Sequence, residues 1–147
     1  MSRIVIVRTQ KERDDAMSVR LAVFVDEQQI PREEEIDAYD DVAVHCVGYA
    51  GDAPDDGAPV AAGRLVVMDG YGKIGRMAVL KQHRGSGLGA QVLAALEREG
   101  VALGLTRFQL SAQLAARGFY ERAGYSAFGD VYDDVGIPHI DMEKIAS

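Results

Sequence analysis

Gln82-His83-Arg84-Gly85-Ser86-Gly87-Leu88-Gly89 is the stretch of this chain that decides its fold. It stands between a run typical of a strand, Lys73 to Val79, and a run typical of a helix, Leu88 to about Leu103. A strand, a glycine-rich turn and a helix in that order predict an anion site. The turn and the helix start present unpaired backbone N–H groups and the positive end of the helix dipole. Arg84 adds a positive charge beside them.

Three kinds of phosphate-binding loop resemble this stretch. A nucleoside-triphosphatase loop ends in Gly-Lys-Ser/Thr, which is absent here. The dinucleotide pattern G-x-G-x-x-G/A is matched by Gly85, Gly87 and Ala90, but it also requires an acid about 20 residues later, and Thr106 to Ser111 contains none. The third pattern, Q/R-x-x-G-x-G/A, is filled by Gln82 and the same two glycines. A glycine turn that only begins a helix is the remaining alternative.

Length and composition limit the possible classes of protein. A chain of 147 residues with 48% hydrophobic and 27% charged residues is typical of one globular domain, here residues 1–147. The net charge of −7 argues against a nucleic-acid partner, which needs a basic face. The single cysteine, Cys46, excludes an intrachain disulfide, and no cysteine–histidine set indicates a metal. No apolar run is long enough for a signal peptide or a membrane span, so we expect a cytoplasmic protein.

Hydrophobic patterns along the chain predict an α/β fold of the order β-α-β-β-β-α-β-α-β-β. This order mixes hairpins with crossovers, so we expect a mixed sheet with helices on both faces. The turn cluster Gly51 to Pro59 predicts the connection between the second and third strands. The acidic segment Arg32 to Asp41 is interpreted as a solvated loop, of which one or two acids face an acceptor site in the alternative interpretation. The expected strands span about residues 3–8, 42–50, 60–68, 73–79, 107–112, 125–134 and 139–145, and the helices 11–25, 88–103 and 115–123.

This element order and three local motifs resemble the GNAT acyltransferase superfamily over nearly the whole chain. The motifs are the Gln82 loop, the strand Ile74-Gly75-Arg76-Met77-Ala78-Val79, and Phe119-Tyr120-Glu121-Arg122-Ala123-Gly124-Tyr125. The resemblance implies the GNAT fold, a mixed central sheet of about seven strands that is splayed between the fourth and fifth strands. Within the superfamily the chain looks closest to ElaA-like proteins. The segments that carry this closer likeness are Val23 to Gln28, Asp37 with Asp40, Leu110 to Gln113, and Gly136 to Ile140.

The resemblance also implies acetyl-CoA as the acyl donor and a set of residues that hold it. Backbone groups of the bulged fourth strand would pair with the pantetheine arm, which is itself strand-like. Gln113 stands where many relatives use an asparagine to hold pantetheine, so that contact is a departure from the family pattern. The residues expected to bind the donor are Met77, Ala78, Val79, Gln82, Arg84, Gly85, Ser86, Gly87, Leu88, Gly89 and Gln113.

Acyl transfer to an amine needs an acid for the leaving thiolate and a base for the ammonium. Tyr120 is the candidate acid, with a packed aromatic residue as the alternative. His45 and His139 are the candidate bases, with a structural hydrogen-bonding role as the alternative for each. The candidate residues for acceptor binding are the acids Glu27, Asp37 and Asp40 and the arginines Arg20 and Arg64, which could instead pair with the acidic segment.

These residues together predict an acetyl-CoA-dependent N-acetyltransferase. The acceptor would be a primary amine of a small molecule or peptide that attacks the thioester directly, since Cys46 lies in no nucleophile motif. Two alternatives remain open: a non-catalytic sensor that binds acyl-CoA, and a nucleotide-binding regulatory domain that uses the Gly85 to Ala90 match. Family habit alone suggests a homodimer, and neither a membrane nor a metal is expected.

Overall fold

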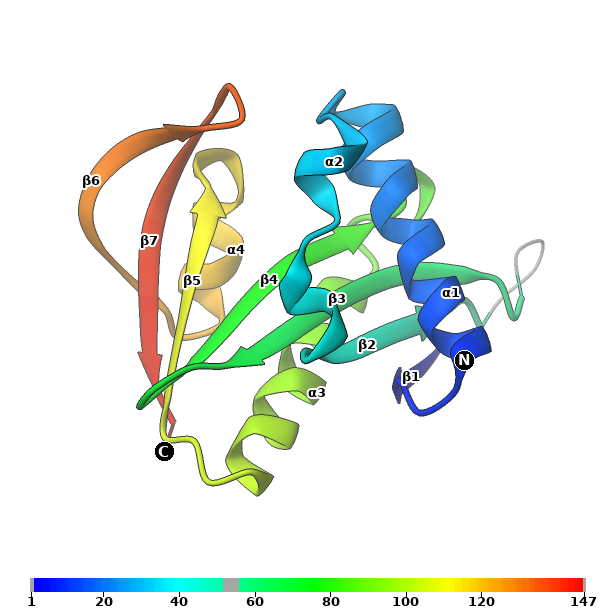
Figure 1. Cartoon of the computed structure of the whole chain (residues 1–147), viewed down its shortest axis with the longest axis horizontal. Helices are drawn as coiled ribbons and strands as arrows, with labels where there is room; N and C mark the ends of the chain where they lie inside the picture. Colours follow the sequence, from blue (N-terminus) through cyan, green and yellow to red (C-terminus); the bar gives the residue numbers. More distant parts are fainter. Residues whose placement is uncertain (1, 52–55, 147) are drawn as a thin grey trace.

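The computed structural model describes residues 2–51 and 56–146 and has the predicted order of strands and longer helices, with a further short helix at Arg32–Glu35 that was expected as a loop (Figure 1). Residues 52–55 of the predicted turn cluster lie outside the described residues. The strands are β1 (Arg3–Ile6), β2 (Val44–Tyr49), β3 (Pro59–Val67), β4 (Gly72–Val79), β5 (Arg107–Gln113), β6 (Ser126–Asp134) and β7 (Ile137–Ile145). The helices are α1 (Gln10–Arg20), η1 (Leu21–Glu27), α2 (Arg32–Glu35), η2 (Ala38–Asp41), η3 (Lys81–His83), α3 (Leu88–Ala102), η4 (Leu114–Ala116) and α4 (Arg117–Arg122).

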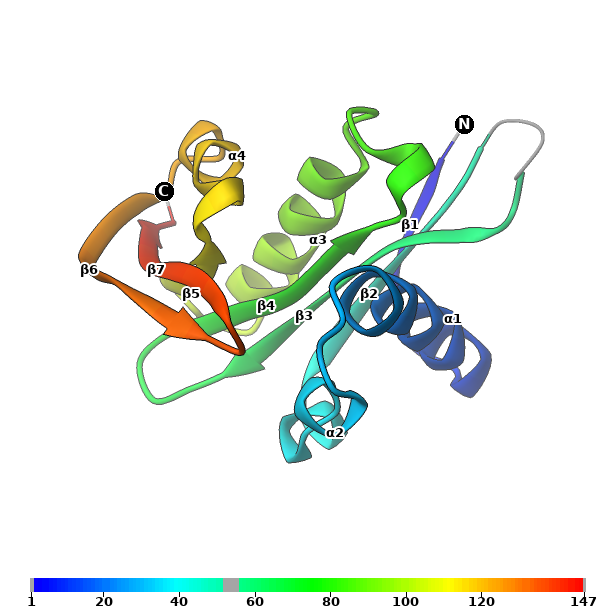
Figure 2. The same ribbon diagram turned by 90° about the horizontal axis from the view of Figure 1, so that it is seen from above.

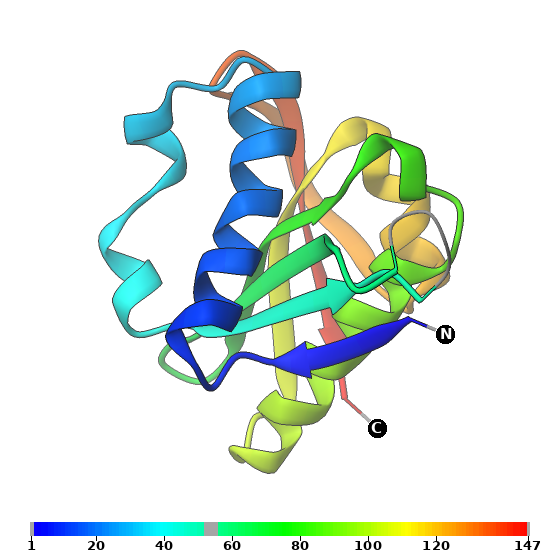
Figure 3. The same cartoon turned by 90° about the vertical axis from the view of Figure 1, so that its right-hand side faces the viewer.

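All seven strands form one mixed sheet in the order β1-β2-β3-β4-β5-β7-β6. Figure 2 shows α1 and α2 on one face of this sheet and α3 and α4 on the other. Figure 3 shows α1 lying along the face of the N-terminal half of the sheet. The predicted layers, with helices on both faces, are confirmed. Among the described residues, no helix is both long and apolar enough to cross a membrane.

Strands β4 and β5 separate soon after they meet. They are parallel and pair only through Gly72 with Phe108, Lys73 with Gln109, and Ile74 with Leu110. Beyond Ile74 the two strands diverge, whereas β5 remains paired with β7 along its whole length. The predicted splay between the fourth and fifth strands is therefore confirmed.

A bulge lies in β4 at the point of separation. Its pairing with β3 passes from Gly75 opposite Arg64 to Ala78 opposite Ala62, so two residues, Arg76 and Met77, lie opposite the single Gly63. Arg76 has a φ of 52°, a left-handed conformation that is strained for any residue with a Cβ. The bulge bends the strand and turns its backbone away from β5.

Two hydrophobic cores lie on opposite faces of the sheet. The larger one lies under α3 and includes Leu65, Leu96 and Phe108. The smaller one lies between α1 and the sheet and includes Val19 and Val47. Cys46 belongs to the larger core and is 0% exposed, which confirms its interpretation as a small buried apolar residue.

The first helix differs from the prediction at its C-terminal end. It was expected as a single helix over 11–25, but the regular α-helix ends at Arg20 and continues as the wider π-helix η1. The N–H of Gln28 donates to the carbonyl of Val23, five residues earlier. Such π-type segments recur at functional sites because they change the direction of the side chains that follow.

Most of the acidic segment is exposed, as its composition predicts, but it forms α2 and η2 instead of a loop, and two of its acids are buried. Glu35 and Asp40 are buried, and both contact Arg20, whose side chain is 1% exposed. Nε of Arg20 donates to Glu35 Oε1 at 3.0 Å, and Nη1 donates to Asp40 Oδ1 at 2.7 Å. The arginine from α1 therefore supplies the charge that allows these carboxylates to be buried.

Two more arginines extend this cluster to the sheet. Arg64 of β3 donates to Asp37 at 2.7 Å and to Asp40 at 2.8 Å. Arg76, the bulged residue of β4, lies 3.1 Å from Glu35 Oε2 and donates to Asp37 Oδ2 at 3.2 Å. We call Arg20, Glu35, Asp37, Asp40, Arg64 and Arg76 the arginine cluster. It joins α1 and the acidic segment to the strained position of β4.

The arginines of this cluster change the ionisation of its aspartates. Hydrogen bonds from Arg64 lower the pKa of Asp37 below its usual value. Burial acts to raise the pKa of Asp40, but the hydrogen bonds and charge of Arg20 and the hydrogen bond of Arg64 outweigh burial and hold it far below its usual value. Both aspartates are therefore ionised at neutral pH.

We predict that Arg20→Met strongly destabilises the protein, because it leaves Glu35 and Asp40 buried without their charge partner. Breaking a buried pair in this way lowers the free energy of unfolding by about 3–5 kcal/mol. Arg13→Met is the matched control, since Arg13 pairs with the exposed Asp41 at 3.2 Å, and such surface pairs contribute about 0–1 kcal/mol. Urea unfolding of both variants measures the difference. Equal losses in the two variants would contradict the role given to the buried cluster.

We also predict that the difference in unfolding free energy between the wild type and Arg20→Met becomes smaller at acidic pH. A carboxyl whose pKa is lower in the folded than in the unfolded state stabilises the fold above its unfolded pKa, and that contribution is lost as the pH falls through the folded pKa. Asp37 and Asp40 belong to this class. The wild type should therefore lose stability as the pH drops below about 4, the ordinary aspartate pKa. Arg20→Met should lose less over the same range. Unfolding curves at a series of pH values between neutral and acid check this, and parallel losses would refute it.

Candidate functional site

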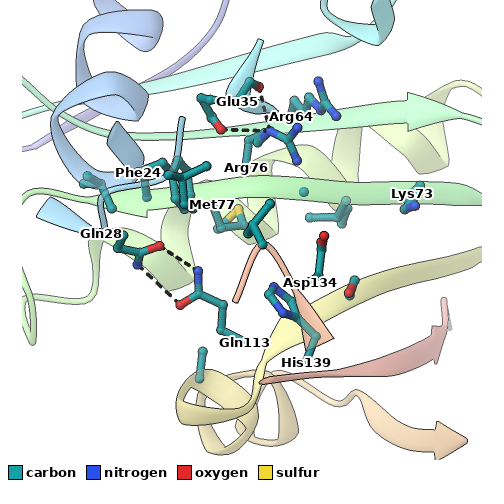
Figure 4. A pocket seen from close by; sticks show the side chains of 18 of the residues that line it. Phe24, Gln28, Glu35, Arg64, Lys73, Arg76, Met77, Gln113, Asp134 and His139 are labelled. Carbon is teal, nitrogen blue, oxygen red and sulfur yellow. Dashed lines mark hydrogen bonds and ion pairs between the residues drawn. The ribbon is translucent and has the colours of Figure 1, made fainter. Parts of the chain in front are cut away.

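A cavity of about 450 Å³ lies where β4 and β5 separate. One side is lined by β3 and β4, and the other by β5 and the start of β7. Residues of η1, the α2 segment and α4 complete the lining. Figure 4 shows the cavity from close by, with Gln113 and His139 on one side and Met77 and Arg76 on the other.

The glycine-rich loop is exposed and has the geometry of an anion cradle. Gly85 and Gly87 have φ values of 80° and 85°, which only glycine adopts easily. A Cβ built at Gly85 would meet nothing within 4 Å, and one built at Gly87 only the tip of the Gln91 side chain at 3.9 Å. Gly87 precedes α3 without a side-chain cap. The first N–H groups of this 15-residue helix, beginning at Leu88, therefore remain available to an anion.

Strand β4 offers a backbone edge next to this loop. From Gly75 to Val79 it has β3 on one side and no paired strand on the other. Met77, Ala78 and Val79 all line the cavity. The free edge and the cradle fit an elongated ligand with an anionic end, as an acyl-CoA has, since a strand-like arm can pair with the edge.

Arg84 lies between the loop and the strand. Its Nε donates to the carbonyl oxygen of Val79 at 2.9 Å, and its two terminal nitrogens bind both carboxylate oxygens of Glu27, at 2.7 Å and 2.6 Å. Hydrogen bonds from Arg84 lower the pKa of Glu27. Glu27, expected at an acceptor site, therefore contacts the predicted donor-binding arginine instead, and it does not line the cavity.

Gln113 forms a pair of hydrogen bonds across the gap. Its Nε2 donates to Gln28 Oε1 at 2.8 Å, and Gln28 Nε2 donates to Gln113 Oε1 at 3.3 Å. Gln113 ends β5, and Gln28 follows η1, so this amide pair joins the two sides of the cavity (Figure 4). The residue that departs from the family pattern is thus held by a glutamine from the first helical segment.

Tyr120 of α4 lines the cavity and is otherwise buried. Its ring packs edge-on against Phe119 and Tyr125, with centroids 5.0 Å and 6.0 Å away. Among the described residues, no buried side-chain polar atom lacks a partner, so its hydroxyl is either bonded or open to the cavity. Burial raises the pKa of Tyr120, so the phenol keeps its proton at neutral pH.

The two candidate bases occupy different places. His139 lines the cavity, and its Nδ1 lies 2.7 Å from the carbonyl oxygen of Ile137. A carbonyl only accepts, so Nδ1 carries the proton and Nε2 keeps a lone pair in the neutral ring. His45 does not line the cavity, and its Nε2 lies 2.8 Å from the carbonyl oxygen of Asp40. Burial lowers the pKa of His45.

Four of the candidate acceptor-binding residues belong to the arginine cluster, and only two of these line the cavity. Asp37 and Arg64 line the cavity, whereas Arg20 and Asp40 lie behind it and do not. All four bind one another through the cluster. The alternative considered for Arg20 and Arg64, pairing with the acidic segment, is the arrangement present in the structure.

Sequence reasoning missed several lining residues: Gln28, Lys73, Arg76 and Asp134. Lys73 and Arg76 lie on a strand that was recognised, and the resemblance implied its bulge, but the sequence alone does not show that these two side chains line a cavity. Asp134 ends β6, and Gln28 follows a helix whose π-type end was not anticipated. The sequence places these residues far apart, and only the fold brings them to one cavity.

Comparison with known proteins agrees with this geometry. Residues 21–146 match the family model described as "Acetyltransferase (GNAT) domain". The chain is 41% identical over 143 residues to a Bacillus subtilis protein described as "Uncharacterized N-acetyltransferase YjcF", covering 97% of this chain and 99% of that protein.

Solved structures give the same result. An acyl-CoA N-acyltransferase from Pseudomonas aeruginosa superposes with a TM-score of 0.82 at 32% identity, covering 98% of each chain. Escherichia coli ElaA superposes with a TM-score of 0.79 at 27% identity, also covering 98% of each chain. The separated strands, the glycine cradle at the start of α3 and the family match over most of the chain lead to one conclusion: this chain belongs to the GNAT acetyltransferase family.

Proposed function

We propose that this enzyme transfers an acetyl group from acetyl-CoA to a primary amine of a small molecule or peptide, by direct attack of the amine on the thioester. The observation that carries the proposal is the continuous path from the exposed glycine loop, along the free edge of β4, to a cavity that contains Tyr120 and His139. Acetyl-CoA supplies the activated acyl group. The residues of this chain hold it, orient it and move protons.

Donor binding would use backbone groups more than side chains. The diphosphate would lie on the N–H groups from Gly85 to Gly89, where glycines leave room for close approach and the dipole of α3 favours negative charge. The pantetheine arm would pair with the edge at Met77 and Val79. A backbone N–H near Val79 would polarise the thioester carbonyl if the bound thioester placed its oxygen there, where negative charge develops.

His139 is the better supported of the two candidate bases. Its Nε2 is free to take a proton from the ammonium form of the acceptor, because Nδ1 is already committed to the Ile137 carbonyl. The neutral amine then forms the new N–C bond while the C–S bond breaks. His45 is turned toward Asp40 and lies outside the cavity lining.

Tyr120 would donate its phenolic proton to the leaving sulfur, and the second proton that the nitrogen loses as the amide forms would restore the phenol. Its raised pKa keeps that proton in place until charge develops on the thiolate. A covalent acyl-cysteine route has no support, because Cys46 is fully buried and burial raises the pKa of its thiol to about 12. Direct attack therefore fits the chain better than a two-step route.

The proposal is tested by free thiol released from acetyl-CoA with a panel of primary amines. We expect release above the hydrolytic background with at least one class of amine. Calorimetry with acetyl-CoA, CoA and NAD accompanies the panel. Tight binding of both CoA forms without thiol release from any amine would favour a non-catalytic sensor, and a preference for NAD would favour the nucleotide-binding alternative.

We predict that Gly87→Ala weakens acetyl-CoA binding tenfold or more, because a Cβ at this position strains the cradle and crowds the N–H groups that face the diphosphate. Gly70→Ala is the matched control. Gly70 has the same φ of 85° as Gly87 and open space around it, but lies in the turn between β3 and β4. Both variants should lose similar stability, and calorimetry should show weaker binding only for Gly87→Ala. Equal affinities would contradict the cradle.

We predict that His139→Gln lowers kcat by about 10²–10⁴, the usual contribution of a general base, with acetyl-CoA affinity unchanged. His45→Gln should change kcat by only a few fold, because His45 faces away from the cavity. Steady-state thiol release with the best amine of the panel measures both. The opposite ranking of the two variants would assign the base to His45.

A further inference from the structure

Resting on the function proposed above, we propose that the acceptor is an amino acid or similar compound, with a carboxylate beside its primary amine. The amine would lie at His139 and Asp134, and the carboxylate would bind Lys73 on the facing strand. This site would lie at the end of the cavity away from the glycine loop, and among the residues expected to bind the donor only Gln113 borders it, opposite His139.

One side of this end of the cavity is a continuous polar surface. Strands β5, β7 and β6 pair side by side, with Ser111 opposite Asp141, Gln113 opposite His139, and His139 opposite Tyr132. Paired residues point to the same face of a sheet, and so do residues two apart on one strand. The shared face therefore carries Ser111, Gln113, Tyr132, Asp134, His139 and Asp141, while Leu110, Ala112, Ile140 and Met142 on the opposite face enter the core.

The directions of the hydrogen bonds on this surface leave oxygen atoms that can accept a further hydrogen bond. Asp141 can only accept from Tyr132, at 2.7 Å, so the phenol oxygen of Tyr132 in turn accepts from Ser111. The Ser111 oxygen then keeps its lone pairs, and Ser111 lines the cavity together with His139. Asp134 lies diagonally across the β6–β7 pair from His139 (Figure 4). Lone pairs and one carboxylate are what an alkylammonium group requires.

Lys73 provides the opposite charge on the facing strand. It lies on β4 and lines the same cavity as Asp134. Within residues 2–51 and 56–146, neither side chain takes part in an ion pair, whereas the arginines of the cavity are all paired with carboxylates. The cation of Lys73 and the carboxylate of Asp134, both unpaired among the described residues, match the two charges of a zwitterion.

Gly75 leaves room for such a ligand between Lys73 and Arg76. A Cβ built at Gly75 meets nothing within 4 Å, although this residue lies inside a strand and lines the cavity. Its φ is not in the left-handed region, so a larger side chain would cause no backbone strain there. The space in front of Gly75 is thus open to a ligand and can be filled by substitution.

A polyamine is the main competing acceptor. Glu34 and Asp134 both line the cavity with carboxylates that form no ion pair among the described residues, and they would suit a second amine. The positive charge of Lys73 would repel the second protonated amine, and Lys73 would still lack a carboxylate partner. The positive charge of Lys73 therefore favours an amino acid, which carries a carboxylate, over a polyamine.

The experiment compares α-amino acids with their amides and their decarboxylated amines, and adds β-alanine, γ-aminobutyrate and spermidine. Thiol release from saturating acetyl-CoA gives kcat/KM for each. We expect the best free acid to exceed its own amide by about tenfold or more, the usual scale of one charge-assisted hydrogen bond. Equal values for acid and amide, or a preference for spermidine, would overturn the proposal.

Three variants test where in the cavity the acceptor and its carboxylate bind. Lys73→Met should remove the difference between acid and amide, whereas Lys73→Arg should keep most of it. Gly75→Leu should raise the acceptor KM at least tenfold without changing the KM for acetyl-CoA. If Lys73→Met leaves the acid-to-amide ratio unchanged, the carboxylate does not bind at Lys73 and the assignment fails.

A second readout separates this proposal from the proposed function. Calorimetry with the CoA-loaded protein, which cannot transfer an acyl group, measures binding of the same acid and amide pairs. Selective binding of the acids without thiol release from acetyl-CoA would support the acceptor site and refute the catalytic function. Thiol release that is as efficient with amines that carry no carboxylate as with the matching acids would support the function and refute the acceptor class. If neither acids nor amides bind the loaded protein, the acceptor site is refuted.

Discussion

The separation of β4 from β5 after only three residue pairs is the constraint on which the rest of this molecule depends. Two parallel strands in the middle of a sheet ordinarily stay paired, since unpaired backbone groups are costly when buried. Here the strands diverge, and the resulting space becomes a cavity lined from both halves of the sheet. The free edge of β4 then needs another partner, and an extended ligand can provide it.

The separation is stabilised from both sides by polar contacts. The bulge at Arg76 turns β4 away, and the side chain of this strained residue is held by Glu35 and Asp37. Arg20 and Arg64 in turn hold Glu35, Asp37 and Asp40, so α1 and the acidic segment support the bulge. The pair Gln28 and Gln113 joins the two sides near the end of β5. A buried charge cluster is weak as a source of stability, but it fixes one geometry because each member is costly to leave unpaired.

Charge divides the cavity into parts with different tasks. The glycine loop and the start of α3 present backbone donors, and Arg84 is neutralised by Glu27 next to them. Tyr120 lines the cavity from α4, and His139 lines it from β7. At the far end, polar residues of β5, β6 and β7 face Lys73 across the open space at Gly75. In the proposed function, donor binding and acceptor binding would therefore use opposite ends of one cavity.

The sequence by itself determined the order of strands and helices, the glycine cradle and the GNAT resemblance, because these depend on local periodicity and on short motifs whose residues are adjacent in the chain. It predicted that most of the acidic segment is exposed, but not that Glu35 and Asp40 are buried against Arg20, and it left His45 and His139 equivalent. Only the tertiary structure decided which histidine reaches the cavity, which charges are paired, and that Lys73 and Asp134 line one site. These properties depend on side-chain directions set by a bulge, a π-type turn and pairing between distant strands, and neither composition nor spacing encodes them.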